Sequence, residues 1–219
     1  GMSRAIKAAA GEFVLIFNSD DELLPRGLSH SIALLNSNSN ADFVSTSALF
    51  GVYLKDAKVY EHKGKLSPES ILFGGPAINA RLFRRNLLER LGPLRSDLGL
   101  CADREYLLRI FRSGAEGLFS KTPLYFNRQH AGSHTFANGR ATRLRNYNAG
   151  FHLAVALSKE FQKDPNLYGV IQAYLAVSKL KLRLVGEKEF PSETPHVTFS
   201  DLIRGLLAHR RWRGSLSGF

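Results

Sequence analysis

An unbroken apolar run near the N-terminus constrains this chain more than any other feature. Phe13 to Phe17 reads FVLIF, with no alternation of polar and apolar residues. Such a run is typical of a strand that is covered on both faces, as in a parallel α/β sheet. The polar turn Asn18-Ser19-Asp20-Asp21 follows at once. The sequence therefore predicts a buried strand with two adjacent carboxylates just past its carboxyl end.

The first 136 residues predict further strands and helices around this one. Helices are indicated over residues 25–35, 85–91 and 103–112, and strands over residues 42–53, 76–83, 118–119 and 124–126. Pro25 suits the first position of its helix, and Ser67 followed by Pro68 marks another helix start. This part of the chain belongs to the α/β class.

After Ser133 the pattern changes to long helices. Apolar residues recur at helical spacing in two sets, Leu144, Tyr147, Phe151, Val155 and Phe161, then Leu167, Ile171, Tyr174, Leu175 and Leu182. Asp164-Pro165 separates these two helices, and Thr198 with Asp201 caps a third. We therefore expect an α/β part over residues 1–136 and a helical annex over residues 137–219.

The charge of the chain is strongly basic. Lys and Arg total 30 against 19 acids, a net charge of +11, and residues 137–219 carry 13 of the bases and six of the acids. A basic surface favours nucleic acid, anionic lipid or phosphorylated substrates. The sequence has no RNA-binding sheet motif and no zinc finger, so charge alone supports nucleic acid as a partner.

Cysteine usage and hydropathy indicate a compartment. The only cysteine, Cys101, excludes an intramolecular disulfide and a Cys-rich zinc site. The apolar run at 13–17 is too short to cross a bilayer as a helix, and the N-terminus lacks the layout of a secretory signal. We expect a cytoplasmic protein in a reducing environment.

The candidate site residues each allow two interpretations. Asp20 and Asp21 could bind a hard divalent cation with a diphosphate, or one of them could cap the helix that begins at Pro25. Asp103 could be a helix N-cap or a general base for an incoming hydroxyl. Arg128 and His130 follow a predicted strand and could face a phosphate.

Taken in order, these segments resemble the later part of a family 2 glycosyltransferase catalytic domain, which has the GT-A fold. The segments are residues 1–12, the acidic segment FVLIFNSDDELLP, residues 80–85 with Leu91-Gly92, residues 102–109, and Arg128-Gln129-His130 with Ser133. The resemblance implies a partial GT-A-like domain followed by the helical annex.

The resemblance also implies a reaction, the inverting transfer of a sugar from a nucleotide-sugar donor to a glycan or lipid-linked acceptor. A divalent metal, Mn or Mg, would be held by Asp20 with Asp21 or Asn18 beside it. Arg128 and His130 would lie on the donor side, and Arg84 and Arg85 on the acceptor side. Asp103 would deprotonate the acceptor hydroxyl.

Three features depart from the family pattern. Asn18 stands where an Asp is frequent, and Ala102 stands where an acid often precedes the catalytic Asp. The chain also begins just ahead of the acidic strand, whereas the family has several βα units there that bind the nucleoside base. The departures leave open a truncated protein that is inactive alone. The alternatives are a non-catalytic interaction protein that retains the fold, and a basic nucleic-acid-binding module.

Two partner predictions follow. The strand at 13–17 is too apolar for an exposed edge, so we expect a homodimer that buries it. Residues 202–219 mix Leu, Ile and Trp with Arg, so this tail is either a basic amphipathic segment that contacts the inner membrane face or a packed helix with a frayed basic end.

Overall fold

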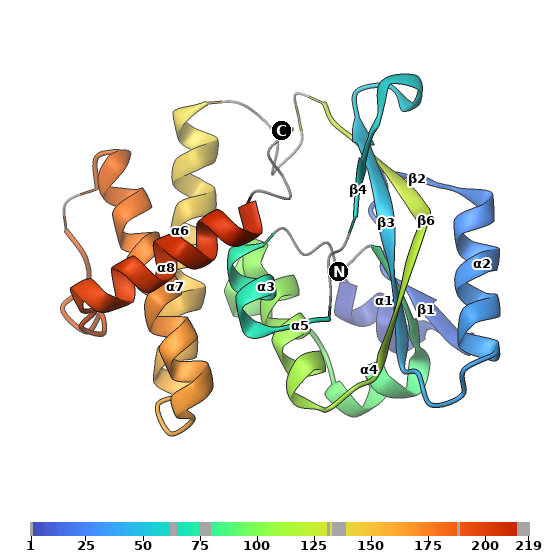
Figure 1. Ribbon diagram of the computed structural model, residues 1–219, viewed down its shortest axis with the longest axis horizontal. Helices are drawn as coiled ribbons and strands as arrows, with labels where there is room; N and C mark the ends of the chain where they lie inside the picture. Colours follow the sequence, from blue (N-terminus) through green and yellow to red (C-terminus); the bar gives the residue numbers. More distant parts are fainter. Residues whose placement is uncertain are drawn as a thin grey trace.

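The computed structural model describes residues 2–61, 65–74, 80–130, 132, 139–187 and 189–213. A twisted sheet has helix α2 on one face and α4 and α5 on the other, and the last three helices lie beyond α3 (Figure 1). The strands are β1 Phe13–Leu15, β2 Glu22–Leu23, β3 Phe43–Gly51, β4 Lys58–Tyr60, β5 Arg81–Arg84 and β6 Gly117–Arg128. The helices are α1 Met2–Ala8, α2 Pro25–Asn36, α3 Pro68–Phe73, α4 Arg85–Leu91, α5 Ala102–Arg112, α6 Arg140–Glu160, α7 Pro165–Leu184 and α8 Phe199–Arg213, with short 3₁₀ turns at Leu54–Asp56 and Ser96–Cys101.

The sheet is mixed rather than parallel. Its strand order is β1-β5-β3-β6-β2, with β4 paired to β3. Only β3 and β6 run parallel among the described strands, whereas β1 pairs antiparallel with β5. The first strand, whose apolar run is typical of a parallel sheet, thus has an antiparallel neighbour among the described strands. The pattern of apolar residues reports which faces are covered, and it carries no information on the direction of the neighbouring chain.

The strand β1 is nevertheless covered on both faces. Val14 and Ile16 belong to the main core on the side of α4 and α5, and Phe13 and Leu15 pack against a second cluster beneath α2. This part of the prediction is confirmed. Because β1 ends the strand order, its second edge pairs with no strand in the part of the chain that the structure describes.

Most predicted elements are found, with shifted ends. Ser67 caps α3 in a reciprocal pair of hydrogen bonds with Ser70. The two predicted strands at 118–119 and 124–126 form one strand, β6, whose register against β3 shifts around Ser47. The strand predicted over 76–83 is observed from Arg81, while residues 76–79 lie outside the described part.

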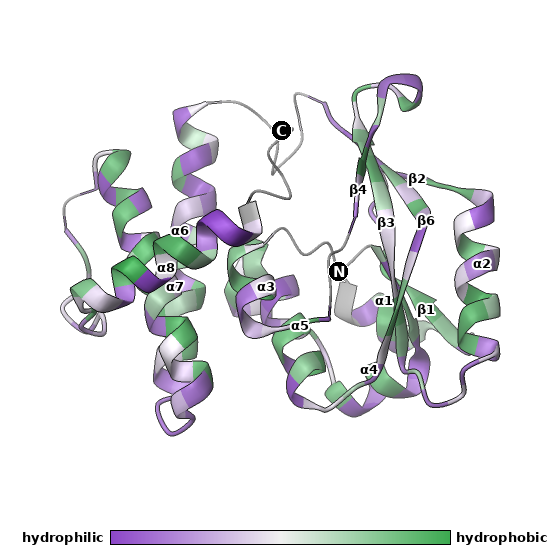
Figure 2. Cartoon of the chain, viewed as in Figure 1, coloured by the Kyte–Doolittle hydropathy of each residue, from purple (hydrophilic) through white to green (hydrophobic). Residues whose placement is uncertain are grey.

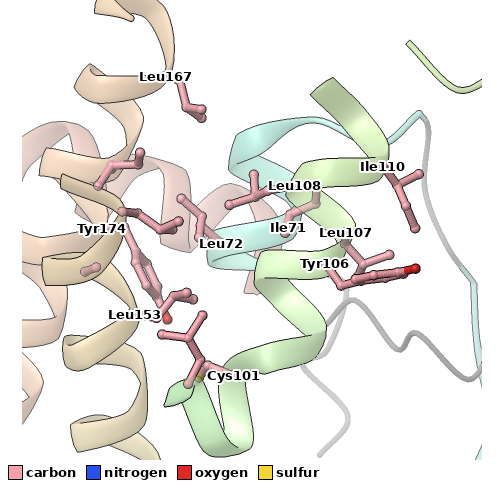
Figure 3. Packing of buried hydrophobic residues seen from close by; sticks show 14 of the residues in the cluster. Ile71, Leu72, Cys101, Tyr106, Leu107, Leu108, Ile110, Leu153, Leu167 and Tyr174 are labelled. Atoms are coloured by element: carbon pink, nitrogen blue, oxygen red, sulfur yellow. The ribbon is translucent and has the colours of Figure 1, made fainter. Parts of the chain in front are cut away.

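The helical annex and the α/β part share one hydrophobic core. Figure 3 shows Leu153 and Tyr174 of the annex next to Leu72 of α3 and Cys101 before α5. The ring of Tyr174 meets Phe73 edge-on, with centroids 5.5 Å apart. The boundary near residue 136 therefore does not separate two cores, and the division into two domains remains a prediction.

The annex consists of α6 and α7 packed together, with α8 lying across α7 and α3. Thr198 and Asp201 form the predicted reciprocal cap at the start of α8. Gly205 lies buried where α8 crosses α7, and a Cβ there would overlap the Ala173 carbonyl. The tail is therefore a packed helix up to Arg213, whereas residues 214–219 lie outside the described part. None of the described helices combines the length and the hydropathy that a bilayer crossing requires.

Candidate active site

The acidic turn, Asn18 to Asp21, connects β1 to β2 and lies against the end of β6. Strand β2 pairs with β6 through Glu22 opposite Phe126, which brings the turn to the residues that follow Phe126. One carboxylate oxygen of Asp21 accepts a hydrogen bond from Asn127 Nδ2 at 2.9 Å, and the other accepts one from Asn18 Nδ2 at 3.2 Å. Asp21 is thus directed toward the sheet and held by two amides.

The neighbouring carboxylate of Asp20 faces a different environment. It is exposed, and its Oδ2 lies 3.0 Å from His130 Nε2. The hydrogen bond from His130 lowers the pKa of Asp20, with smaller contributions from the charges of His130 and Arg128. Burial, followed by repulsion from Asp20, raises the pKa of Asp21. The turn therefore carries one carboxylate that stays ionised near solvent and one that is partly desolvated.

The helix-cap interpretation of the acidic turn is wrong. Leu24 is the N-cap of α2, and it makes no side-chain capping bond. Both Asp20 and Asp21 precede β2 and bond to residues of β6 or just beyond it. The turn is therefore shaped by strand pairing, which leaves the carboxylate of Asp20 available at the sheet edge.

The donor set at the turn fits a cation only in part. The described residues contain no group of three or more His, Cys, Asp and Glu side chains that could hold a metal ion. A hard cation that takes most of its oxygens from a diphosphate needs only one or two protein carboxylates. Asp20 meets that requirement, whereas both oxygens of Asp21 already accept hydrogen bonds from amides.

The third candidate carboxylate, Asp103, lies in the first turn of α5. Cys101 is the N-cap of this helix, so the N-cap interpretation of Asp103 is wrong. The side chain is partly buried, and its Oδ1 accepts a hydrogen bond from the Arg104 backbone N–H at 2.8 Å. Desolvation raises the pKa of Asp103, against the lowering effect of Arg104 and the more distant Arg81. A carboxylate with a raised pKa suits a general base.

A buried arginine that the sequence argument missed connects Asp103 to the acidic turn. Arg81 is only 1% exposed at the start of β5, and burial lowers its pKa to about 10 despite nearby Tyr60, Tyr125 and Asp103. Tyr125 in turn interacts with both Arg81 and Asp21. Arg81 precedes Leu82, which lies opposite Leu15 at the end of β1, so these charges act on one another at the end of the sheet from which the acidic turn leaves.

A sequence signal for Arg81 did exist. In the strand Arg81–Arg84, alternate side chains share a face, so Arg81 lies on the same side as Phe83. Phe83 is fully buried in the main core, on the side of α5. Strand alternation thus predicts a charge among apolar neighbours, which is typical of functional sites.

The two arginines predicted on the acceptor side lie elsewhere. Arg84 pairs with Phe13 at the start of β1, at the end of the strand remote from the acidic turn. Its guanidinium donates to the carbonyls of Leu35 and Ala41 and pairs with Glu12 at 3.1 Å. Arg85 donates to the Ala10 carbonyl at 3.0 Å. The structure therefore does not bring these two side chains to Asp103, and it gives both a role in tying the N-terminal segment to the sheet.

The other predicted donor-side residues do gather at the turn. Asn18 donates to Asp21, His130 contacts Asp20, and the charge of Arg128 at the end of β6 acts on Asp20. Glu105, two residues after the candidate base, is 3% exposed and pairs with Arg109 at 2.7 Å. Arg109 in turn donates to the carbonyls of Leu91, the last residue of α4, and Pro93. Glu105 is thus engaged in a structural contact.

Comparison with known proteins shows a similarity of fold to solved structures, but no match to a family or a curated protein. No protein-family model matches the chain, and no curated protein does. Among solved structures, it is similar to S. aureus TarS 1-349 in complex with UDP-GlcNAc, with 16% identity, a TM-score of 0.54, and coverage of 97% of this chain and 60% of that one. A mannosyltransferase from Pyrobaculum calidifontis in complex with GDP-Man and Mn²⁺ matches with 18% identity and a TM-score of 0.48, over 99% of this chain and 60% of that one. This chain therefore spans about three fifths of either structure, and its fold is like that of TarS.

Proposed function

We propose that the chain is a glycosyltransferase-like protein of the family 2 type that acts on a nucleotide-sugar donor. The observation that carries the proposal is the pairing of Leu15 with Leu82, which puts Arg81 at the end of β1 from which the acidic turn leaves, where its charge also acts on Asp103. This arrangement would supply a base and a cation-binding carboxylate at the same end of the sheet. The fold shared with TarS, which binds UDP-GlcNAc, supports the same assignment.

On the donor side, Asp20 would hold a divalent cation, Mn or Mg, together with the diphosphate. Such a cation neutralises the charge that develops on the leaving diphosphate. His130 keeps the Asp20 carboxylate ionised and oriented. Arg128 adds positive charge at the same place. Asp21 would hold the turn in shape by accepting hydrogen bonds from the side-chain amides of Asn18 and Asn127, rather than bind the cation.

On the acceptor side, Asp103 would take the proton from the attacking hydroxyl. The acceptor would be a glycan or a lipid-linked glycan. Attack on the face of the sugar opposite the leaving diphosphate inverts the anomeric carbon. The raised pKa of Asp103 makes this carboxylate a stronger base than an ordinary Asp.

The open edge of β1 supports a further part of the proposal. β1 ends the strand order, and no described strand pairs with its second edge. Its side chains are apolar on both faces, which natural edge strands avoid. A second copy of the chain would cover this edge, and the homodimer should be evident as a doubled mass in light scattering.

The transfer proposal is tested by release of nucleoside diphosphate from UDP- and GDP-sugars with Mn²⁺, where water stands in for an acceptor. We expect metal-dependent release that falls about 100-fold or more in Asp103→Asn, the lower end of the range for losing a general base. Asp97→Asn is the matched control, because Asp97 is an exposed carboxylate that pairs with Arg95. Release that is equal in both variants would contradict the role of Asp103.

A further inference from the structure

The outward face of α8 is apolar where a surface helix is normally polar. Phe199, Ile203, Leu206 and Leu207 are 77%, 43%, 41% and 62% exposed. Their spacing of three and four residues puts them on one side of the helix. Gly205 lies on the opposite side, buried against α7. A large part of this apolar stripe is therefore exposed.

Positive charge flanks this stripe. Arg210 and Arg211 are exposed on α8, whereas the guanidinium of Arg204 pairs with Asp201 at 3.8 Å and lies near Gly169 of α7. Figure 2 shows hydrophobic and strongly hydrophilic residues following one another along the helix. The only acid of the helix, Asp201, is occupied in the N-terminal cap, where it accepts hydrogen bonds from Thr198. The outward face is thus basic and apolar at once.

A groove continues the apolar surface at the far end of the stripe. It has a volume of about 470 Å³ and runs between α8 and the start of α3. From α8 it is lined by Leu207, Ala208, Arg211 and Trp212, and from the start of α3 by Ser67 and Glu69. The exposed apolar area is therefore larger than the four side chains of the stripe.

We propose that the outward face of α8, Phe199 to Arg211, binds an anionic lipid membrane in the plane of the interface. Apolar side chains would enter the headgroup boundary while the arginines bind lipid phosphates and other anionic headgroups. A second copy of this chain fits less well, because a symmetric contact would bring the arginines of both faces together. Nucleic acid would use the arginines but leave the apolar stripe in water. The proposal does not depend on the transfer activity.

Co-sedimentation of the full chain with vesicles tests this inference. Vesicles of equal phosphatidylglycerol and phosphatidylcholine should bind the chain, and pure phosphatidylcholine vesicles should bind it far less. Leu207→Ser should weaken binding about tenfold, as expected for removing one inserted leucine. Arg210→Gln should weaken it about fivefold and reduce its sensitivity to salt.

Two matched substitutions control for general effects. Leu184 is 77% exposed at the end of α7, so Leu184→Ser removes an exposed leucine outside the stripe. Arg26 is exposed on α2, on the far side of the sheet, and Arg26→Gln matches the charge change. Both variants should bind vesicles like the unaltered chain.

Several results would overturn the proposal. One is no sedimentation with the anionic vesicles at low salt. Another is an equal loss in Leu207→Ser and Leu184→Ser. Tight oligonucleotide binding that Leu207→Ser leaves intact, without vesicle binding, would assign the arginines to nucleic acid. A dimer that Leu207→Ser dissociates would assign the stripe to a second copy.

Discussion

The two aspartates of the acidic turn are adjacent in sequence but differ in chemistry. Asp20 points to solvent beside His130, whereas Asp21 is held by amides of Asn18 and Asn127. Sequence alone could place both carboxylates after a strand, but it could not tell them apart. The difference arises from β6, whose end lies more than 100 positions away in the chain.

The raised pKa of Asp103 has a consequence for stability. Because its pKa is raised, the Asp103 carboxyl binds a proton more tightly in the folded chain than in the unfolded chain. The folded state therefore loses stability as the pH rises from about 3.8, the ordinary pKa of Asp, through the raised pKa of Asp103. At pH 7 we therefore expect Asp103→Asn to unfold at the same temperature as the unaltered chain or a higher one. Thermal unfolding at pH 7 and at pH 3.5 measures this, and a lower melting temperature at pH 7 alone would contradict it.

The positive charge of Arg81 lowers the pKa of Asp103, which predicts a change in the pH dependence of activity when Arg81 is replaced. Replacing Arg81 by Met removes a positive charge near the carboxylate, so the pKa of Asp103 should rise. The acidic limb of the pH–rate profile for donor cleavage should move to higher pH in Arg81→Met and stay close to its original position in Arg81→Lys. If activity falls equally at every pH, Arg81 has only a structural role.

At the scale of elements, patterns within a segment predicted where helices begin and end, but they did not predict which segments contact one another. Helices α2, α4 and α5 begin and end close to the expected positions, because Pro25, Gly92 and the helical spacing are local signals. The antiparallel pairing of β1 with β5 joins residues about 70 positions apart, and the direction of that pairing leaves no mark in either segment. The same limit explains Arg84. The sequence placed it between a predicted strand and a predicted helix, but it did not show that this point lies at the end of β1 remote from the acidic turn.

The contact between α7 and α8 depends on a single glycine. A Cβ at Gly205 would overlap the Ala173 carbonyl and approach Val177 Cγ2 to 2.7 Å. Gly205→Ala should therefore cost about 1–3 kcal/mol in the free energy of unfolding, as overpacking does. Gly169 is the control, because a Cβ there meets only the mobile end of Arg204 at 3.3 Å. Gly169→Ala should be neutral or stabilising in denaturant unfolding, and equal destabilisation of both variants would count against this account of the contact.

At the scale of the whole molecule, the α/β part and the annex share one hydrophobic core. The main core runs from Val14 of β1 to Leu182 of α7 without a break between the parts. The sequence predicted the change from mixed strands and helices to long helices. That change does not show whether the two segments share a hydrophobic core. The likeness in fold to TarS extends over 97% of this chain.

The most direct test of the candidate site is calorimetric titration of UDP and GDP into the chain, with and without Mn²⁺. We expect binding that requires the metal and is abolished by Asp20→Ala. Asp97→Ala should leave it unchanged, since Asp97 is another exposed carboxylate whose pKa is lowered by a hydrogen-bonded cation, here Arg95. Binding that is independent of Mn²⁺ or unaffected by Asp20→Ala, or no binding at millimolar nucleotide, would contradict the assignment of the acidic turn as a diphosphate site.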